Sequence, residues 1–272
     1  MPEAVAASIR DAAGRATTTL AEAGCDSPRL DAELLLAEAL GCDRAELVLR
    51  ADSPVPVDAL ECFERLVARR AAREPVAYIL GRKEFRRITL SVDRRALIPR
   101  PETELLVEVG VSLPPSARVV DVGTGTGAVA LALKDERPDL SVVAVDIDSD
   151  ALDLARENAT RLGLEVSFVQ ADLLDGDVYD AVLANLPYLA AADELPPEIA
   201  QYDPRRALFG GAHGLDLIRR LIPRVAGVPV VALEVGRGQA REVGELLCHT
   251  GFMSVESLRD LAGIERVVVG RS

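Results

Sequence analysis

Several residue types that define metal sites or disulfide scaffolds are scarce in this sequence. The 272 residues include four cysteines and two histidines, namely Cys25, Cys42, Cys62, Cys248, His213 and His249. Because no two cysteines form a CxxC pair, the sequence predicts neither a disulfide framework nor a zinc site. Sparse cysteines that act as small hydrophobic residues are typical of a reducing compartment, so we expect a cytoplasmic protein without a metal ion.

Long hydrophobic runs and excess positive charge are lacking as well. No stretch approaches the ~18 uninterrupted apolar residues of a membrane span. Glu3 and Arg10 stand where a signal peptide needs an apolar core, so we do not expect export. The 44 acidic residues outnumber the 31 basic ones and give a net charge of −13. A protein with this negative net charge is repelled overall by the phosphates of nucleic acid, so we do not expect a direct nucleic-acid partner. Since no segment could span a membrane, we do not expect a membrane partner either.

The composition does provide for folded cores. Apolar residues make up 49% of the chain, and its length suggests roughly two domains. Residues 1–73 are predicted to form a small helical bundle, in which Asp43 and Glu46 resemble the capping box that begins a helix. Residues 74–99 are predicted to be a linker, with a short strand or hairpin in the partly alternating segment 85–92.

Strands and helices alternate in the remainder of the chain. Strands are predicted at 117–122, 141–146, 166–172, 179–185, 228–236, 252–258 and 264–270, with helices at 128–136, 149–163 and near 238–250. Alternation of this kind predicts an α/β fold with a parallel sheet and helices on both faces. We expect the fourth of these strands to lie beside the first, and the last two strands to be antiparallel because only a short turn separates them.

A glycine-rich turn follows the first of these strands, in the sequence DVGTGTG (121–127). Alternate glycines allow the backbone to approach a ligand closely, and the N–H groups at the start of the next helix can bind an anion. Gly123, Gly125 and Ala128 also satisfy the dinucleotide pattern G-x-G-x-x-A. The turn alone therefore fits either a nicotinamide cofactor or S-adenosylmethionine.

Two aspartates are predicted at the ends of the next strands. Asp146 follows the second strand, where a carboxylate can accept hydrogen bonds from ribose hydroxyl groups. Asp172 ends the third strand, where it could meet the amino group of an adenine. Helix capping and turn formation are alternative explanations for both residues.

The tetrapeptide Asn185-Leu186-Pro187-Tyr188 ends the fourth strand. An asparagine amide offers a donor and an acceptor together, Pro187 stiffens the loop, and Tyr188 supplies an aromatic face. This combination suits a planar amide or amino group whose nitrogen must be directed at an electrophile. Nicotinamide-dependent dehydrogenases do not need it, and no Ser-His-Asp relay is evident.

Seven segments together resemble one family, the HemK/PrmC-type N5-glutamine methyltransferases, which modify the glutamine of the GGQ tripeptide in peptide-chain release factors. They are LDAELLLAEALG (30–41), EPVAYILGRKEF (74–85), LIPRPETELLVE (97–108), DVGTGTGAVALAL (121–133), DPRRALFGGAHGLDLIRRLI (203–222), ALEVGRGQA (232–240) and DLAGIERVVVGR (260–271). The resemblance spans nearly the whole chain. IPRPETE and the DPRRAL block are its most specific parts, whereas the glycine loop and Asp146 occur in many methyltransferases.

The resemblance implies an architecture and a reaction. Residues 1–73 would be a substrate-recognition domain, 74–99 a linker with a β-hairpin, and 100–272 a Rossmann-like class I methyltransferase domain. The cofactor would be S-adenosyl-L-methionine, and the partner would be the GGQ-bearing domain of release factors. We expect the enzyme to act as a cytoplasmic monomer.

The resemblance also implies roles for individual residues. The methionine end of the cofactor would be held by Gly123, Thr124, Gly125, Thr126 and Gly127, with Asp146 at the ribose and Asp172 and Leu173 near the adenine. Asn185 would contact the cofactor as well. The acceptor glutamine would be bound by Asn185, Leu186, Pro187 and Tyr188. Of these, Asn185, Pro187 and Tyr188 are predicted to be catalytic.

The sequence departs from the family pattern at a few positions. Leu186 stands where the family usually has the first of two prolines, and Asp203-Pro204 replaces the usual Glu-Pro. Asn-Leu-Pro-Tyr is also found in ribosomal-RNA adenine dimethyltransferases. Adenine N6-methylation of nucleic acid is therefore the alternative to methylation of a protein glutamine.

Overall fold

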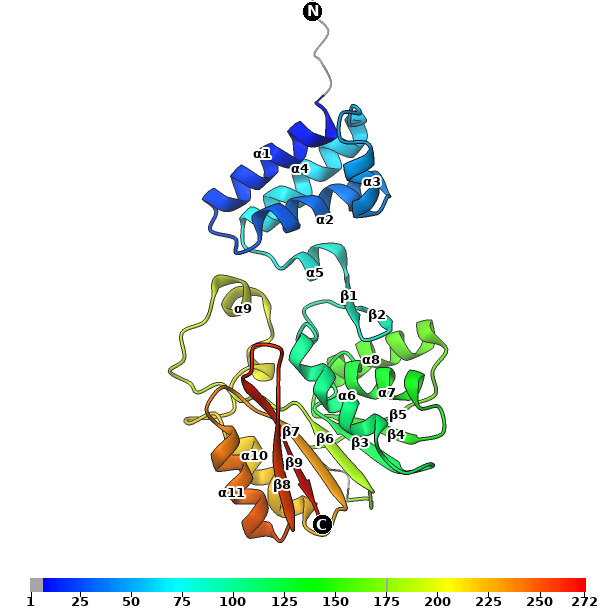
Figure 1. Ribbon diagram of the computed structural model, residues 1–272, viewed down its shortest axis with the longest axis vertical. Coiled ribbons are helices and arrows are strands. Elements are labelled where there is room, and N and C mark those ends of the chain that lie inside the picture. The colour runs from blue at the N-terminus through cyan, green and yellow to red at the C-terminus, as the bar shows by residue number, and fades with distance from the viewer. Residues whose placement is uncertain (1–6, 175) are drawn as a thin grey trace, which may run out of the picture. The chain divides into compact units, whose positions relative to one another are not determined.

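The computed structural model describes residues 7–174 and 176–272 (Figure 1). They form two compact units. The first comprises the residues up to Gly81 together with Pro196–Tyr202, and the second comprises Arg82–Leu195 and Asp203–Ser272. The boundary at Gly81 falls inside the predicted linker, and residues 1–6 of the predicted helical domain lie outside the described residues. No described helix is both long enough and apolar enough to span a membrane.

The first unit is helical throughout its described elements. These are α1 (Ile9–Glu22), α2 (Pro28–Leu40), α3 (Arg44–Leu49), α4 (Val57–Ala71), α5 (Val76–Leu80) and α9 (Pro197–Tyr202). As predicted, Asp43 caps α3 by accepting a hydrogen bond from the Glu46 backbone N–H at 2.9 Å. Leu35, Leu36 and Phe63 lie in a hydrophobic core to which residues of α1 to α5 contribute.

Buried ion pairs hold α9 to this unit, although α9 is far from the other helices in sequence. The buried Arg70 guanidinium donates to Asp31 at 2.7 Å and to Glu198 at 3.1 Å. Arg73 donates to the same Glu198 carboxylate at 2.7 Å. Because a buried arginine is costly without its partners, these contacts explain why residues 196–202 belong to the helical unit.

The second unit begins with an antiparallel hairpin of β1 (Arg82–Phe85) and β2 (Ile88–Ser91). Its main sheet has the order β5-β4-β3-β6-β7-β9-β8, formed by β3 (Arg118–Val122), β4 (Ser141–Asp146), β5 (Ser167–Gln170), β6 (Ala181–Ala184), β7 (Val230–Glu234), β8 (Ser254–Arg259) and β9 (Glu265–Arg271). The first five strands in this order pair in parallel, and β9 is antiparallel to both β7 and β8. The predicted α/β fold is confirmed, including the place of β6 beside β3 and the antiparallel closing pair.

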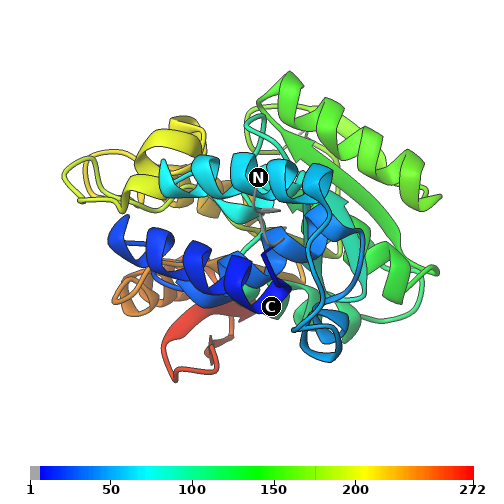
Figure 2. The same cartoon turned by 90° about the horizontal axis from the view of Figure 1, so that it is seen from above.

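Helices cover both faces of this sheet. They are η1 (Pro101–Thr103), α6 (Glu104–Val111), α7 (Ala128–Glu136), α8 (Ser149–Leu162), η2 (Arg205–Ala207), α10 (Asp216–Leu221), η3 (Ile222–Val225) and α11 (Ala240–Thr250). Helices α6, α7 and α8 lie on one face, and α10 and α11 lie on the other (Figure 1). Figure 2 shows α8 in green and α11 in orange on different sides of the unit.

Side-chain alternation along β3 separates the two faces. Val120 and Val122 belong to the core that includes residues of α10 and α11, whereas Asp121 faces α7 and accepts a hydrogen bond from the Ala130 backbone N–H. The strand order reverses between β3 and β6, so the connections after these two strands leave toward opposite faces. A crevice at the carboxyl end of the strands follows from this topology.

Candidate active site

The glycine-rich turn joins β3 to α7 and uses three left-handed residues. Gly123, Gly125 and Gly127 have φ angles of 75°, 55° and 83°, which side chains disfavour. A Cβ on Gly125 would meet nothing nearer than the Ala96 methyl group at 3.8 Å, so this part of the turn borders open space. A Cβ on Gly127 would lie 2.9 Å from Leu131. Gly127 therefore serves helix packing, while Gly125 leaves room for a ligand.

Asp146 closes the turn from the end of β4. Its Oδ2 accepts a hydrogen bond from the Gly125 N–H at 2.9 Å, and its Oδ1 accepts one from the Asp148 N–H at 3.0 Å. Burial raises the pKa of this carboxyl group above its ordinary value. An ionised carboxylate has about four acceptor positions, so each oxygen can still accept a further donor.

Asp121 is a second carboxyl group beneath the same turn. Its Oδ2 accepts hydrogen bonds from the Thr124 hydroxyl at 2.6 Å and from the Ala130 N–H at 3.2 Å. Burial, with a smaller contribution from the charge of Asp146, raises its pKa to about 7. The sequence analysis assigned no role to Asp121, although it is the first residue of the DVGTGTG motif.

Asp172 and Leu173 follow β5. The Asp172 carboxylate forms an ion pair with Arg220, and its backbone oxygen accepts a hydrogen bond from Arg224 at 2.7 Å. Leu173 is buried and has a positive φ of 72°. Both residues line the pocket, and the side chain of Asp172 already has a cationic partner.

Asn185 follows β6 and is held by a side chain from η1. Its Nδ2 donates to Thr103 Oγ1 at 3.0 Å, so the IPRPETE segment contacts the Asn-Leu-Pro-Tyr segment directly. The next residue, Leu186, is buried against the glycine turn, where a Cβ on Gly123 would lie 3.1 Å from Leu186 Cδ2. The leucine that departs from the family pattern therefore fills space beside the loop.

Tyr188 contacts a buried glutamate at the end of β7. Its hydroxyl group donates to Glu234 Oε1 at 3.4 Å, and burial together with the charge of Glu234 raises the pKa of Tyr188. Glu234 is 1% exposed, and burial raises its pKa to about 7. The sequence analysis did not identify Glu234; the available signal was an acid ending the otherwise apolar strand VVALE.

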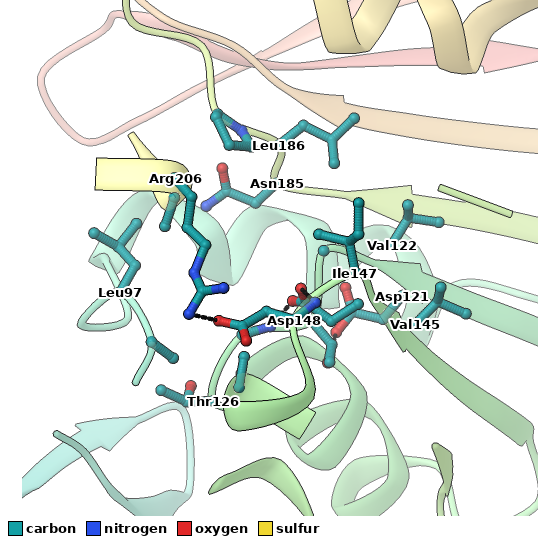
Figure 3. Close-up of a pocket in the computed structure, with 18 of the residues that line it drawn as sticks. Leu97, Asp121, Val122, Thr126, Val145, Ile147, Asp148, Asn185, Leu186 and Arg206 are labelled. Atoms are coloured by element: carbon teal, nitrogen blue, oxygen red, sulfur yellow. Dashed lines mark hydrogen bonds and ion pairs between the residues drawn. The ribbon is translucent and has the colours of Figure 1, made fainter. Parts of the chain in front are cut away.

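Two ion pairs bring further family segments to the same place. Arg100 of IPRPETE pairs with the buried Asp203 of the DPRRAL block at 2.7 Å between Nη2 and Oδ2. Arg206 of the same block reaches Asp148, after β4, at 2.5 Å (Figure 3). Segments that are far apart in sequence thus converge around the carboxyl ends of β3, β4 and β6.

These elements enclose one pocket at the crevice (Figure 3). The predicted site residues that line this pocket are Gly123, Thr124, Gly125, Thr126, Asp146, Asp172, Leu173, Asn185, Leu186 and Pro187. Gly127 and Tyr188 do not line it. The segment 95–100, Thr103, Asp121, Asp148 and Arg206 also line the pocket, and the sequence analysis gave none of them a role.

Comparison with solved structures shows the same fold in other methyltransferases. A methyltransferase from Pyrococcus furiosus is 17% identical, with a TM-score of 0.53 over 67% of this chain and 87% of that one. A T. thermophilus 16S rRNA N2 G1207 methyltransferase, solved with AdoMet and guanosine, is 17% identical, with a TM-score of 0.51 over 70% of this chain and 49% of that one. At these identities the likeness shows the class I methyltransferase fold.

Sequence comparison identifies the family. Residues 11–81 match the model of the PrmC N-terminal domain, and residues 101–201 match the methyltransferase small domain. A release factor glutamine methyltransferase of Mycolicibacterium smegmatis is 43% identical over 96% of each chain. One of Geobacter sulfurreducens is 40% identical over 93% of this chain and 92% of its own. The chain belongs to the release factor glutamine methyltransferase family.

Proposed function

We propose that the chain transfers a methyl group from S-adenosyl-L-methionine to the side-chain amide nitrogen of the glutamine in the GGQ motif of release factors. The observation that carries this proposal is the Asn185 amide at the wall of the pocket, held by Thr103 through its Nδ2 atom at 3.0 Å. The opposite end of that amide is a carbonyl oxygen. It can accept a hydrogen bond from an acceptor NH2 group.

The residues of the pocket fit the cofactor. Gly125 has no side chain, and a Cβ there would meet nothing nearer than 3.8 Å, so the methionine part can approach the backbone at this residue. Asp146 has free acceptor positions for the ribose hydroxyls, and Leu173 offers an apolar surface to the adenine. S-adenosylmethionine supplies a methyl group on a sulfonium, whose neutral thioether product leaves without an acid catalyst.

The main difficulty lies with the acceptor, because an amide lone pair is delocalised into its carbonyl group. If Asn185 Oδ1 and the Leu186 carbonyl each accept one amide hydrogen, the nitrogen presents its face to the methyl carbon. S-adenosylmethionine bound beside Asn185 would then supply the methyl group to this nitrogen, its sulfur would keep the electron pair of the broken carbon–sulfur bond, and the nitrogen would give up one proton to solvent. Positioning of this kind can contribute up to about 7–11 kcal/mol.

The helical unit is the proposed recognition domain for the release factor. Its match to the PrmC N-terminal domain supports this assignment. Val48, Leu49 and Val57 are 76%, 85% and 73% exposed, so these apolar residues are accessible to a partner. We further propose that the enzyme acts as a cytoplasmic monomer and that nucleic acid is not its substrate. The net charge of −13 opposes binding to nucleic acid.

One incubation tests the reaction and its alternative together. The 272-residue chain receives labelled S-adenosylmethionine with a GGQ-bearing release factor, the same factor carrying GGA, and ribosomal RNA in parallel. We expect label only in the GGQ factor, with peptide mass spectrometry locating one added methyl group on the glutamine. Label in RNA with none in the release factor would contradict the proposal and support adenine methylation.

A further inference from the structure

One loop joins the acceptor segment of the second unit to a helix of the first. The 189–209 loop starts directly after the Asn-Leu-Pro-Tyr segment. Its ends meet where the Leu189 N–H donates to the Leu208 carbonyl at 3.0 Å and the Gly210 N–H donates to the Leu189 carbonyl at 2.9 Å. Between these ends, residues 196–202 belong to the helical unit, whereas the residues on both sides of them belong to the second unit. The loop therefore has its base beside the proposed acceptor residues and its tip, α9, in the helical unit.

The returning part of this loop contributes to the pocket. Asp203 follows α9 directly and pairs with Arg100 at 2.7 Å. Pro204, Arg206 and Ala207 line the pocket, and the Arg206 side chain lies across it in Figure 3. A displacement of α9 would therefore reach the acceptor residues through one end of the loop and the pocket wall through the other.

Polar contacts attach α9 to the helical unit. No residue of α9 is buried, and the described residues of the unit's hydrophobic core include none of them. Glu198 Oε1 accepts hydrogen bonds from Arg73 at 2.7 Å and from Arg70 at 3.1 Å, and its Oε2 accepts a second one from Arg73 at 2.7 Å. The Tyr202 hydroxyl group donates to the Ala72 carbonyl at 2.9 Å. Because bidentate pairs with arginine are among the strong hydrogen bonds, loss of Glu198 should release α9.

Prolines restrict the chain on both sides of this attachment. Pro196 and Pro197 precede Glu198, and Pro204 follows Asp203. A proline ring fixes its own φ at about −65° and limits the conformations of the residue before it. The connections of α9 to the rest of the loop are therefore stiff, so the attachment of α9 limits the positions that both parts of the loop can take.

We propose that Glu198 is a positioning residue, which orders the 189–209 loop at the pocket by holding α9 on Arg70 and Arg73. The inference rests on the proposed function, because the order of this loop affects turnover only if the adjoining Asn185 receives the acceptor amide. Glu198 touches no reacting atom. The helical unit then has a second role besides binding the release factor, since its two arginines also order residues that line the pocket.

The test measures methyl transfer and backbone order in one set of variants. Glu198→Ala removes the attachment, Glu198→Gln keeps one acceptor oxygen without the charge, and Tyr202→Phe removes a single hydroxyl group. Glu33→Ala is the matched control, because Glu33 also pairs with two arginines of the helical unit, Arg29 and Arg44, and its side chain is 21% exposed against 15% for Glu198. Thermal melting and calorimetry show whether each variant is folded and binds S-adenosylmethionine.

Single-turnover methyl transfer to a GGQ-bearing release factor gives the rate with cofactor and release factor saturating. Hydrogen exchange with cofactor bound gives the order of peptides that cover 189–195 and 203–210, which lie outside α9 and in the second unit. Glu198→Ala should be about tenfold or more slower, with little change in the release factor concentration that gives half the maximal rate. Both peptides should exchange about fivefold faster.

The other variants grade this effect. Glu198→Gln should lie between Glu198→Ala and the wild type, Tyr202→Phe should shift both readings in the same direction by a smaller factor, and Glu33→Ala should match the wild type in both. A role of Glu198 in recognition alone would raise the half-saturating concentration of release factor and leave the saturated rate unchanged.

A Glu198→Ala variant with the wild-type saturated rate would overturn the inference. So would a slow variant whose exchange at 189–195 and 203–210 matches the wild type, or an equal loss in Glu33→Ala, because loss of any ion pair in the helical unit would then explain the effect. If Glu198→Ala does not fold, Glu198→Gln and Tyr202→Phe decide by the same two readings. Absence of release factor methylation by the wild-type chain contradicts the proposed function and the effect on turnover, whereas hydrogen exchange separately decides whether Glu198 holds the loop.

Discussion

The two halves of the pocket are built in different ways. On the cofactor side, Asp146 bonds to the backbone N–H groups of Gly125 and Asp148 in neighbouring turns. On the acceptor side, Asn185 depends on Thr103, 82 residues away in sequence, and the contact joins two side chains. Backbone donors remain after most substitutions, whereas a chain of side chains fails when one atom is removed. The cofactor side should therefore tolerate change better than the acceptor side.

The largest expected effect comes from breaking the acceptor side. Asn185→Ala removes both the hydrogen-bond donor and the acceptor of the amide. Asn185→Asp replaces the NH2 donor with an oxygen of a negatively charged carboxylate. Misplacement of a reacting group can cost about 100-fold in rate, and we expect a loss of this order for each variant. Cofactor affinity should change less than threefold, since an orienting contact acts mainly at the transition state. Single-turnover kinetics measures the rate of methyl transfer, and calorimetry measures the affinity for the cofactor.

The next effect concerns the cofactor side. Asp146→Ala removes a carboxylate whose charged hydrogen bonds are worth about 1.5–3 kcal/mol each. We expect S-adenosylmethionine to bind roughly 10- to 100-fold more weakly, with the chain still folded. Calorimetry measures the affinity, and circular dichroism checks the fold. Unchanged affinity would show that Asp146 does not bind the cofactor. Asp153→Ala, on the exposed face of α8, is the control variant and should leave the affinity unchanged.

Each half also holds one buried acid whose pKa is raised to about 7, Asp121 on the cofactor side and Glu234 on the acceptor side. In the unfolded chain these groups ionise near pH 4. The folded state therefore binds more protons, so its stability is full below pH 4 and declines as the pH rises through 7. Between pH 6 and 8 each group should lower the free energy of unfolding by roughly 1 kcal/mol.

Urea unfolding of the ligand-free protein at pH 6, 7 and 8 measures this decline. Asp121→Asn and Glu234→Gln should each make the curve shallower, and by similar amounts. If either variant kept the wild-type slope, the acid it replaces would not titrate in this range. Glu242→Gln, at an exposed position, should leave the slope unchanged.

The smallest expected effect is that of Leu186→Pro, which restores the residue usual in the family. The carbonyl acceptor remains, so the rate should stay within about threefold of the wild-type rate. The buried side chain that packs beside Gly123 is lost, which should lower the melting temperature slightly because a core contact is removed. A large loss of turnover with the fold intact would show that the Leu186 side chain itself positions the acceptor.

The sequence predicted the parts of the site that depend on local signals. The helix predicted at 128–136 has those bounds as α7, because the preceding glycines and the apolar pattern define it. Asp146 was likewise predicted, since it ends an apolar strand at a standard distance from the glycine turn. Periodicity and turn chemistry act over a few residues, so one sequence carries enough information to find them.

Contacts between distant segments could not be predicted in the same way. Neither Thr103 nor Glu234 stands out in the sequence. Thr103 contacts Asn185 and Glu234 contacts Tyr188, and each contact joins segments that are far apart in the chain. The same holds for Glu198, whose ion pairs with Arg70 and Arg73 join 196–202 to the helical unit. The cofactor contact expected of Gly127 stays a prediction, because Gly127 does not line the pocket and a Cβ there would lie 2.9 Å from Leu131.

The most direct test of the difference between the halves is single-turnover methyl transfer to a GGQ-bearing release factor by Asp146→Ala and Asn185→Ala, measured side by side as the cofactor concentration is raised to saturation. We predict that Asp146→Ala approaches the wild-type rate at saturation, because its defect lies in binding. Asn185→Ala should remain about 100-fold slow at every cofactor concentration. An Asn185→Ala variant that regains the wild-type rate at saturating S-adenosylmethionine would contradict the account, since Asn185 would then not orient the acceptor amide.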